Sequence, residues 1–469
     1  MTDLVQSLEA IVGPTNLAKG GDLDRWSSDW LNLYHWDPLA VVRPKTTQEV
    51  AQVVRLANQT GTAVVPVSGN TGLTGGTNAQ GAIMVSLDRM SAIREIKPEA
   101  RVAIVEAGVI LSSLHVAVET HGLIFPLTFG ARGTAMIGGA LSTNAGGSNV
   151  LRYGNTRDLC LGLEVVLPTG EILDLMSALH KDNSGYDLRH LMIGAEGTLG
   201  IITAAVLKLH PKPRAYATAM VAAPSINSAL ALLNRLQEET GGAVEAFEYM
   251  PRNYIEAHLA RFSDARAPFD EMHDVNILVE VGALSARDAT VNADGTVPVV
   301  EHLENVLAAL FEDGAVLDAV IAKSDTQRAE MWARREAAAE VSRLHDPIVD
   351  NDIAVPLDKM QTLIERVEAR ARALDPGITF NSVAHLGDGN LHFAGWPSTD
   401  DKVVHDAIKE AVEEEVLALG GSFSAEHGIG VSKLPSMERR KNPQAMTTMR
   451  AIKAALDPNG IMNPGKVLP

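Results

Sequence analysis

Residues 66–76, PVSGNTGLTGG, form a glycine-rich segment that directly follows the strand-like run AVV at 63–65. Glycine adopts a positive φ easily and lets the backbone approach a ligand, so that successive N–H groups can point inward around an anion. The side chains of Ser68, Asn70 and Thr71 add neutral hydrogen-bond donors. Taken alone, the segment is equally compatible with a plain tight loop.

Two more glycine-rich segments lie further along the chain. Residues 129–147, FGARGTAMIGGALSTNAGG, contain six glycines, and residues 194–202 read GAEGTLGII. The first two segments do not fit GxGxxG in a strand–helix–strand unit, and no GxxxxGK(S/T) motif occurs, which disfavours a Rossmann or P-loop nucleotide site. Three separated loops instead indicate one extended ligand that is touched from several sides, as a dinucleotide would be.

The composition narrows the class of protein. The 469 residues are 46% hydrophobic and 21% charged, which is ordinary for a globular chain. A net charge of −18 disfavours nucleic acids and anionic lipid surfaces as partners. The single cysteine, Cys160, excludes an internal disulfide, a CxxC redox pair and a cysteine-ligated iron–sulfur cluster. Any redox chemistry is therefore expected to use a bound cofactor.

The sequence predicts a domain boundary near residues 208–214, KLHPKPR. Strand-like and helix-like runs alternate before this point, and a second α/β region with fewer glycines follows it. No run of about 18 apolar residues occurs, so no membrane span is predicted. The N-terminus lacks a basic region followed by an apolar run. We expect a cytoplasmic protein, with a peripheral position at the inner membrane as the alternative.

A candidate metal site lies in residues 381–396, NSVAHLGDGNLHFAGW, which reads as a hairpin. If Asp388 and Gly389 are the turn centre, His385 faces His392 with Cβ atoms about 5 Å apart. The later segment SAEHGIG, residues 424–430, adds a carboxylate and a third imidazole. Two histidines and one carboxylate suit a divalent metal that keeps open positions for a substrate.

These segments together resemble flavoproteins of the vanillyl-alcohol-oxidase-type FAD family. The likeness is to its D-2-hydroxyacid dehydrogenases, which act on D-lactate, D-2-hydroxyglutarate or glycolate. It runs from about residue 40 to the C-terminus and is carried by PVSGNTGLTGG, IGGALSTNAGG, RYGNTRDLCLGLEVVLPTGEILD, KDNSGYDL, GAEGTLGIIT and DPNGIMNPGK.

The resemblance implies an α+β fold with a two-part FAD-binding domain of the PCMH type. We expect this domain to comprise residues 1–215. An α/β, ferredoxin-like cap that binds substrate and metal would span residues 216–424, and residues 425–469 would return to the FAD domain.

The resemblance also implies which residues hold FAD. The first loop, SGNTGL, has neither histidine nor cysteine, so the flavin is expected to be non-covalent. The implied FAD-binding residues are Ser68, Gly69, Asn70, Thr71, Gly72, Thr74, Thr134, Ile137, Gly138, Ser142, Asn144, Gly146, Tyr153, Glu196, Gly197, Gly200, Ile201 and Asn463.

By the same resemblance, the metal is Zn or Mn and its ligands are His385, His392 and Glu426. His427 is the implied general base, while Arg335 and Asn390 are the implied substrate-binding residues. The implied reaction oxidises a D-2-hydroxyacid to the 2-oxoacid by hydride transfer to flavin N5. Electrons would then pass to an external acceptor, such as a quinone, a cytochrome or an electron-transfer flavoprotein.

The preferred substrate is expected to carry one carboxylate. In hydroxyglutarate enzymes the resemblance implies a threonine and a lysine for the distal carboxylate, and this chain carries Ala339 and Asp350 there. An aspartate repels a second carboxylate. We therefore expect D-lactate or a related D-2-hydroxy monocarboxylate, with D-2-hydroxyglutarate as the alternative.

Other readings of the sequence stay open. One is an iron(II) oxygenase that uses two histidines and a carboxylate without flavin. Another is the FAD subunit of a glycolate oxidase-type complex, and a third is an oxidase that passes electrons to oxygen. A homodimer is compatible with the sequence, although no pattern points to one.

Overall fold

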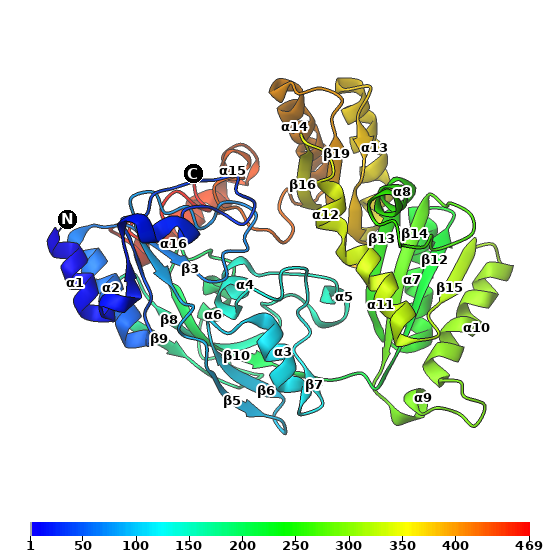
Figure 1. Cartoon of the computed structure of the whole chain (residues 1–469), viewed down its shortest axis with the longest axis horizontal. Coiled ribbons are helices and arrows are strands. Elements are labelled where there is room, and N and C mark those ends of the chain that lie inside the picture. Colours follow the sequence, from blue (N-terminus) through cyan, green and yellow to red (C-terminus); the bar gives the residue numbers. More distant parts are fainter. Residues whose placement is uncertain (1) are drawn as a thin grey trace. The chain divides into compact units, whose positions relative to one another are not determined.

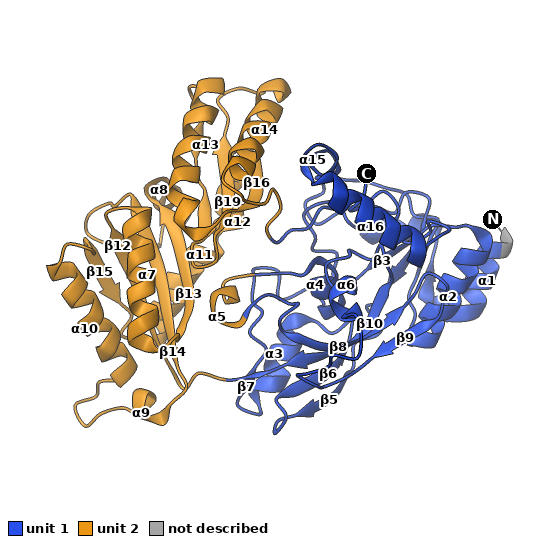
Figure 2. Cartoon of the chain, turned by 180° about the vertical axis from the view of Figure 1, so that it is seen from behind, with its two compact units in different colours: residues 1–146, 154–211, 426–469 blue, residues 147–153, 212–425 orange. Residues whose placement is uncertain are grey.

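The structure is a computed structural model that describes residues 2–469, with side chains described from residue 4. The chain divides into two compact units (Figure 2). Unit 1 comprises residues 1–146, 154–211 and 426–469, and unit 2 comprises residues 147–153 and 212–425. The sequence predicts domain boundaries at 215/216 and 424/425, and it does not predict that residues 147–153 belong to unit 2.

Unit 1 begins with a small sheet of order β1-β2-β4-β3, in which β2, β4 and β3 run parallel. Helix α2 starts where the Thr46 side chain accepts a hydrogen bond from the Glu49 N–H, and it ends at Gly61 in the left-handed conformation. The elements are α1 (Thr2–Val12), η1 (Pro14–Asn16), β1 (Leu17–Ala18), η2 (Gly20–Trp26), β2 (Ala40–Val42), α2 (Thr47–Thr60), β3 (Val64–Val67) and β4 (Ile83–Ser86).

The second part of unit 1 is an antiparallel sheet of order β5-β6-β10-β8-β9. Its strands are β5 (Ile93–Lys97), β6 (Val102–Glu106), β8 (Cys160–Val166), β9 (Ile172–Leu175) and β10 (Ile201–Lys208). Strands β7 (Leu123–Ile124) and β11 (His210–Pro211) pair separately, and the helices are α3 (Leu111–Glu119), α4 (Ile137–Thr143) and α6 (Leu188–Met192).

The C-terminal tail completes the first sheet of unit 1. After α15 (Leu434–Arg440) and α16 (Pro443–Leu456), Ile461 accepts a hydrogen bond from the Val64 N–H, and Asn463 N–H donates to the Val64 carbonyl. Ile461 and Met462 are buried in the same apolar core as Val64. The tail therefore packs as part of the domain that begins near the N-terminus.

Unit 2 is built on a large sheet of order β15-β12-β14-β13-β18-β19-β16, with β17 pairing β19 (Figure 1). Its strands are β12 (Ala215–Ala223), β13 (Val244–Pro251), β14 (Val275–Ala283), β15 (Asp318–Ile321), β16 (Val349–Ala354), β17 (Thr379–Phe380), β18 (Val383–His385) and β19 (Asn390–Trp396).

Helices cover both faces of this sheet, because alternate strand residues enter two separate apolar clusters. One face packs against α7 (Ile226–Thr240), α10 (Pro298–Glu312), α13 (Met360–Leu374) and α14 (Lys402–Ala418). The other packs against α8 (Arg252–Arg261), α11 (Asp325–Glu336) and α12 (Ala338–Ser342). Unit 2 also contains α5 (Val150–Tyr153), α9 (Ala286–Ala289) and η3 (Leu357–Lys359).

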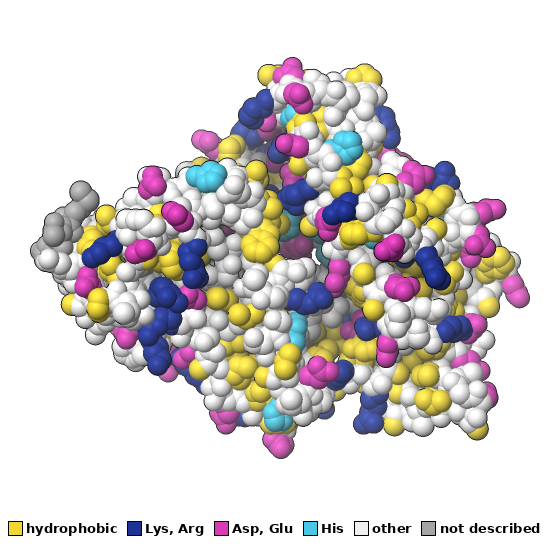
Figure 3. Space-filling model, viewed as in Figure 1, with side chains coloured by type: hydrophobic (Ala, Val, Ile, Leu, Met, Phe, Trp, Pro, Cys, Tyr) yellow, Lys and Arg dark blue, Asp and Glu magenta, His cyan; other side chains and the backbone are white. Residues whose placement is uncertain are grey.

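The predicted α+β class is confirmed by these mixed sheets and helices. Among residues 2–469, no helix combines the length and the apolar character needed to cross a membrane. Acidic and basic side chains are mixed over both units on the face shown in Figure 3. The net charge of the chain is therefore not gathered into one patch on that face.

Candidate functional site

The first glycine loop of unit 1 leaves a row of backbone donors without protein partners. The N–H groups of residues 69–73 donate no hydrogen bond to any residue that the structure describes. A Cβ on Gly69 would lie 2.2 Å from the Thr134 carbonyl oxygen, so only glycine allows the first and second loops to touch here. Asn70 adopts a positive φ of 51°. Such a loop has the donors that an anionic ligand requires.

The second loop continues into α4 and packs closely on the first. A Cβ on Gly138 would lie 2.7 Å from the Ala107 Cβ and 3.3 Å from Ser68 Oγ. The Gly138 N–H donates to the Ala107 carbonyl, and Ser142 Oγ donates to the Gly138 carbonyl at 2.7 Å. Asn144, at the end of the helix, accepts from the Arg157 N–H. These hydrogen bonds fix the conformation of the second loop.

Asn463 joins the third loop and the C-terminal tail to the first loop. Its Nδ2 donates to the Glu196 carbonyl at 2.7 Å and to the Gly76 carbonyl at 3.1 Å. Its Oδ1 is buried and accepts no hydrogen bond from the described residues. A buried acceptor without a donor marks a place where a bound group supplies one. Unpartnered backbone donors in the first loop and this acceptor fit a dinucleotide that carries both phosphates and N–H groups.

Two of the implied FAD residues, Thr74 and Glu196, have side chains that are hydrogen-bonded to the backbone of residues 427–430. The Glu196 carboxylate accepts from the N–H groups of Ile429 and Gly430 at 2.7 and 2.8 Å, and Thr74 Oγ1 donates to the His427 carbonyl at 3.3 Å. Burial raises the pKa of Glu196, and the two backbone donors oppose this only in part. Both side chains therefore hold the segment that carries His427.

Two further implied FAD residues, Gly197 and Gly200, lie in the third loop, whereas Tyr153 lies in unit 2. Gly197 has a positive φ, and a Cβ there would lie 2.4 Å from Pro66 Cγ, while a Cβ on Gly200 would lie 2.7 Å from Val165 Cγ1. Tyr153 belongs to unit 2, where its hydroxyl donates to Glu245 Oε1 at 2.9 Å.

The histidine hairpin of unit 2 has a different register from the predicted one. His385 pairs with Asn390, and Val383 pairs with His392, so the turn is centred on Gly387 and Asp388. The predicted pairing of His385 with His392 was wrong by two residues, because Leu386–Gly389 form a four-residue turn that ends in Gly389 with φ 84°. A shift of two preserves the face of a strand. The two imidazole rings therefore still meet, with centroids 5.2 Å apart.

A buried carboxylate that the sequence analysis missed holds His385. Glu248 lies directly opposite His385 across the β13–β18 pair, and its oxygens are 2.8 and 2.9 Å from His385 Nδ1. Its Oε2 also lies 2.8 Å from Arg335 Nε. Burial alone would raise the pKa of Glu248, but the charges of His385 and Arg335 outweigh burial and lower it. The isolated glutamate in AFEYM, residues 246–250, is the signal that was available.

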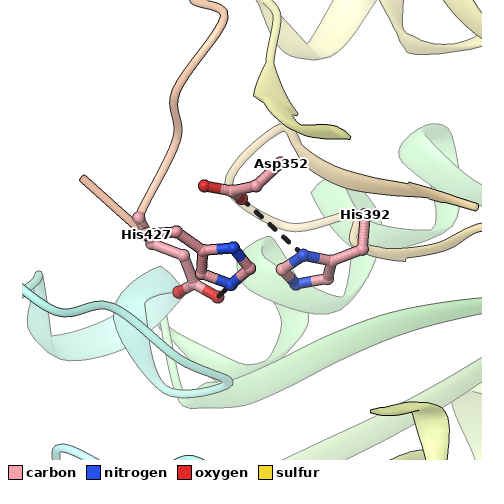
Figure 4. A group of neighbouring side chains, drawn as sticks. Asp352, His392 and His427 are labelled. Atoms are coloured by element: carbon pink, nitrogen blue, oxygen red, sulfur yellow. Dashed lines mark ion pairs between the residues drawn. The ribbon is translucent and has the colours of Figure 1, made fainter. Parts of the chain in front are cut away.

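A second missed carboxylate, Asp352, lies beside His392. The two residues are opposite each other in the β16–β19 ladder, and Asp352 Oδ1 is 3.7 Å from His392 Nδ1 (Figure 4). Asn390 Nδ2 donates to Asp352 at 3.0 Å and to the Ile353 carbonyl at 2.9 Å, so both of its hydrogens are committed to the protein. The other polar atom of the Asn390 amide, Oδ1, has no partner among the described residues.

In unit 1, the carboxylate of Glu426 lies 3.8 Å from His427 Nε2, and both side chains are partly exposed. The N–H of the preceding residue, Ala425 in unit 2, donates to Asp352 Oδ2 at 3.2 Å. Imidazoles and carboxylates such as those of His392, Asp352 and Glu426 are ligand types that a divalent metal takes.

Comparison with known proteins identifies the two regions. Residues 38–176 match the family model of an FAD binding domain, and residues 212–467 match that of the C-terminal domain of FAD linked oxidases. A D-2-hydroxyglutarate dehydrogenase of Xanthomonas citri pv. viticola is 36% identical, with 100% of this chain and 97% of the relative covered. A provisionally named mitochondrial D-lactate dehydrogenase of Schizosaccharomyces pombe is 33% identical, with 95% and 84% covered.

Solved structures share the fold at low identity. p-Cresol methylhydroxylase with substrate bound superposes with a TM-score of 0.74 at 16% identity, covering 99% of this chain and 96% of that chain. An alkyldihydroxyacetonephosphate synthase gives a TM-score of 0.73 at 18% identity, covering 99% and 84%. The predicted PCMH-type FAD-binding fold is confirmed. With both of its family domains matched and whole-length relatives above 30% identity, the chain belongs to the FAD-linked oxidase family.

Proposed function

We propose that the protein is an FAD- and divalent-metal-dependent dehydrogenase that oxidises a D-2-hydroxy monocarboxylate, such as D-lactate, to the 2-oxoacid. The observation that supports this most is in unit 2, where buried Arg335 lies against His385, one member of the histidine pair. A carboxylate-binding cation beside metal-ligand histidines suits a substrate that carries a hydroxyl next to a carboxylate. The names of the relatives support the same substrate class.

FAD, when bound to the three loops of unit 1, supplies the acceptor for a hydride from the substrate carbon. The loops and Asn463 hold it and orient it. Electrons would leave to an external acceptor, because the one buried cysteine can form neither an internal disulfide nor a cysteine-ligated iron–sulfur cluster within the chain.

We propose His385, His392 and Glu426 as the metal ligands. A bound divalent metal would polarise the substrate hydroxyl. Glu426 directly follows Ala425, whose N–H is bonded to Asp352 beside His392. Consecutive Cα atoms are about 3.8 Å apart, so the covalent chain keeps the Glu426 backbone near this strand.

His427 is the proposed general base that takes the hydroxyl proton. A neutral imidazole accepts a proton at physiological pH. Thr74 holds the His427 carbonyl and Glu196 holds the Ile429 N–H, so the backbone is restrained at His427 and just after it, which limits the approach of the ring.

Arg335 and Asn390 are the proposed substrate-binding residues. Arg335 Nη1 makes no hydrogen bond to the described residues, and this edge of the guanidinium would meet the substrate carboxylate. Asn390 can contribute only its carbonyl oxygen, since its amide hydrogens are already donated.

The substrate class is tested by anaerobic flavin reduction with a panel of hydroxyacids. We expect D-lactate or a longer D-2-hydroxy monocarboxylate to bleach the flavin faster than D-2-hydroxyglutarate, because Asp350 would repel a second carboxylate. Faster reduction by D-2-hydroxyglutarate would favour the alternative, which the names of the relatives support. Reduction by L-isomers alone would contradict the stereochemistry. Dye reduction by the purified protein would exclude an obligatory partner subunit.

We also expect the flavin to be non-covalent, because residues 68–73 contain neither histidine nor cysteine. Denaturation in acid followed by filtration should release all of the visible flavin absorbance as free FAD, about one per chain. Yellow colour that stays with the precipitated chain would contradict this prediction.

A further inference from the structure

We infer that Glu248 is a positioning residue that serves the metal ligand and the substrate-binding arginine at the same time. One carboxylate sets the orientation of the His385 imidazole and of the Arg335 guanidinium. The inference rests on the proposed function, because it assigns His385 to the metal and Arg335 to the substrate carboxylate.

The position of Glu248 is unfavourable for a carboxylate without partners. Its strand neighbour Met250, the opposite residue Leu278 on β14, and Val383, two residues before His385 on β18, belong to an apolar cluster. Glu248 itself is 1% exposed. A charge in such surroundings is retained only when it is paired and hydrogen-bonded. The groups that pair it are His385 and Arg335.

The first effect of Glu248 is on His385. Because both carboxylate oxygens lie within 2.9 Å of Nδ1, that nitrogen carries the hydrogen and donates it, although Arg335 Nη2 also lies 3.5 Å away. The ring therefore presents Nε2 as the basic nitrogen for a metal. A carboxylate that accepts from the other ring nitrogen fixes the tautomer and the ring plane of a metal-binding histidine and raises its basicity.

The second effect of Glu248 is on Arg335. The ion pair occupies the Nε side of the guanidinium, and its N–H is not well aligned for a hydrogen bond. The guanidinium is a planar, rigid fork, so holding one edge sets the direction of the other. The same carboxylate therefore relates the metal-binding nitrogen to the edge that would receive the substrate carboxylate.

The chain offers a matched control in Glu280 on β14. Glu280 is 3% exposed and accepts from Arg328 at 2.6 and 2.7 Å and from Trp332 at 2.9 Å, both on α11, the helix that carries Arg335. Its hydrogen-bond partners are Arg328, Trp332 and Thr218, and none of these residues lies in the histidine hairpin. Glu280→Gln therefore tests the loss of a buried carboxylate under the same helix.

The experiment compares Glu248→Gln and Glu280→Gln after metal removal. Zn²⁺ and Mn²⁺ are titrated into each holo-flavoprotein against a competing chelator, and oxalate binding is followed by its effect on the flavin spectrum. We expect Glu248→Gln to raise the metal Kd by about 10- to 100-fold and to weaken oxalate binding. Glu280→Gln should leave the metal Kd within about threefold of the wild-type value, even if it lowers the melting midpoint as much as Glu248→Gln does.

A double variant tests whether Glu248 acts through the histidine. With His385→Ala in place, Glu248→Gln should change the metal Kd by no more than about threefold, since coupled residues are not additive. Full additivity would overturn the inference. If Glu248→Gln does not fold, Glu248→Asp keeps the charge but shortens the reach, and it should weaken metal binding without a matching loss of melting midpoint.

The outcomes separate the inference from the proposed function. If the wild-type protein holds no metal, the metal part of the proposed function is wrong and the inference falls with it. If the wild type holds a metal and Glu248→Gln binds it as tightly as Glu280→Gln does, only the inference is overturned.

Discussion

Replacing His427 by alanine should leave the protein yellow but slow the anaerobic reduction of its flavin by the 2-hydroxyacid by about 10²- to 10⁴-fold. The imidazole is proposed to take the hydroxyl proton, so its loss removes an interaction that forms only during the reaction. The FAD loops should be unaffected, because it is the backbone of this segment that Thr74 and Glu196 hold. Rapid mixing followed at the flavin absorbance gives the rate.

The control for this variant is His121→Ala, which removes an exposed histidine of the same unit. The flavin of His121→Ala should be reduced at the wild-type rate, and this variant should contain as much flavin as the wild type. Bleaching of His427→Ala at the wild-type rate would refute the role of His427 as the base. Loss of FAD from His427→Ala would show instead that the segment shapes the flavin loops.

Removing the metal, or replacing His392 by alanine, should abolish turnover. The loss of turnover on chelation of the wild-type protein should be reversed by adding Zn²⁺ or Mn²⁺. His392→Ala should weaken metal binding by more than the roughly 10- to 100-fold expected for Glu248→Gln, because His392 is proposed to contact the metal directly. Metal content by elemental analysis and dye-coupled activity are measured on the same sample.

His345→Ala is a suitable control for the metal prediction. His345 stacks on Trp396 at the end of β19, with ring centroids 4.2 Å apart, so it is a histidine against the same strand with no predicted ligand role. It should retain the metal. Full activity in a verified metal-free wild-type sample would rule out a catalytic metal.

The parts of the fold that sequence could predict are those set by local pattern. Glycine runs after β-branched strands located the glycine-rich loops, and Gly69 illustrates why, since any side chain there would collide with the Thr134 backbone. The α+β class and the family likewise followed from short segments, each of which is continuous in the chain.

The hairpin shows where pattern reasoning reaches its limit. Face alternation correctly brought His385 and His392 together, because a strand repeats every two residues. The register was wrong because the turn type depends on the backbone of Gly389, where a Cβ would lie 2.3 Å from the Val355 carbonyl oxygen. That contact comes from the residue that follows β16, more than thirty residues earlier, and has no local signal.

The hydrogen-bond partners of the site residues could not be predicted from the sequence, because they lie far away in the chain. Glu248 meets His385 from 137 residues away, and Glu196 meets Ile429 from 233 residues away. A buried carboxylate in an apolar strand does indicate a paired charge, but the sequence does not show which cation pairs with it.

The tail that joins β3 through Ile461 and Asn463 has a consequence for synthesis of the chain. Unit 1 lacks its last sheet contact, the buried Asn463 acceptor and the His427 segment until the ribosome has made all of unit 2. At roughly 5–20 residues per second, residues 212–425 take about 10–40 s. The early part of unit 1 therefore has an incomplete first sheet until unit 2 has been made, and we expect full capture of FAD only after residues 426–463 have joined it.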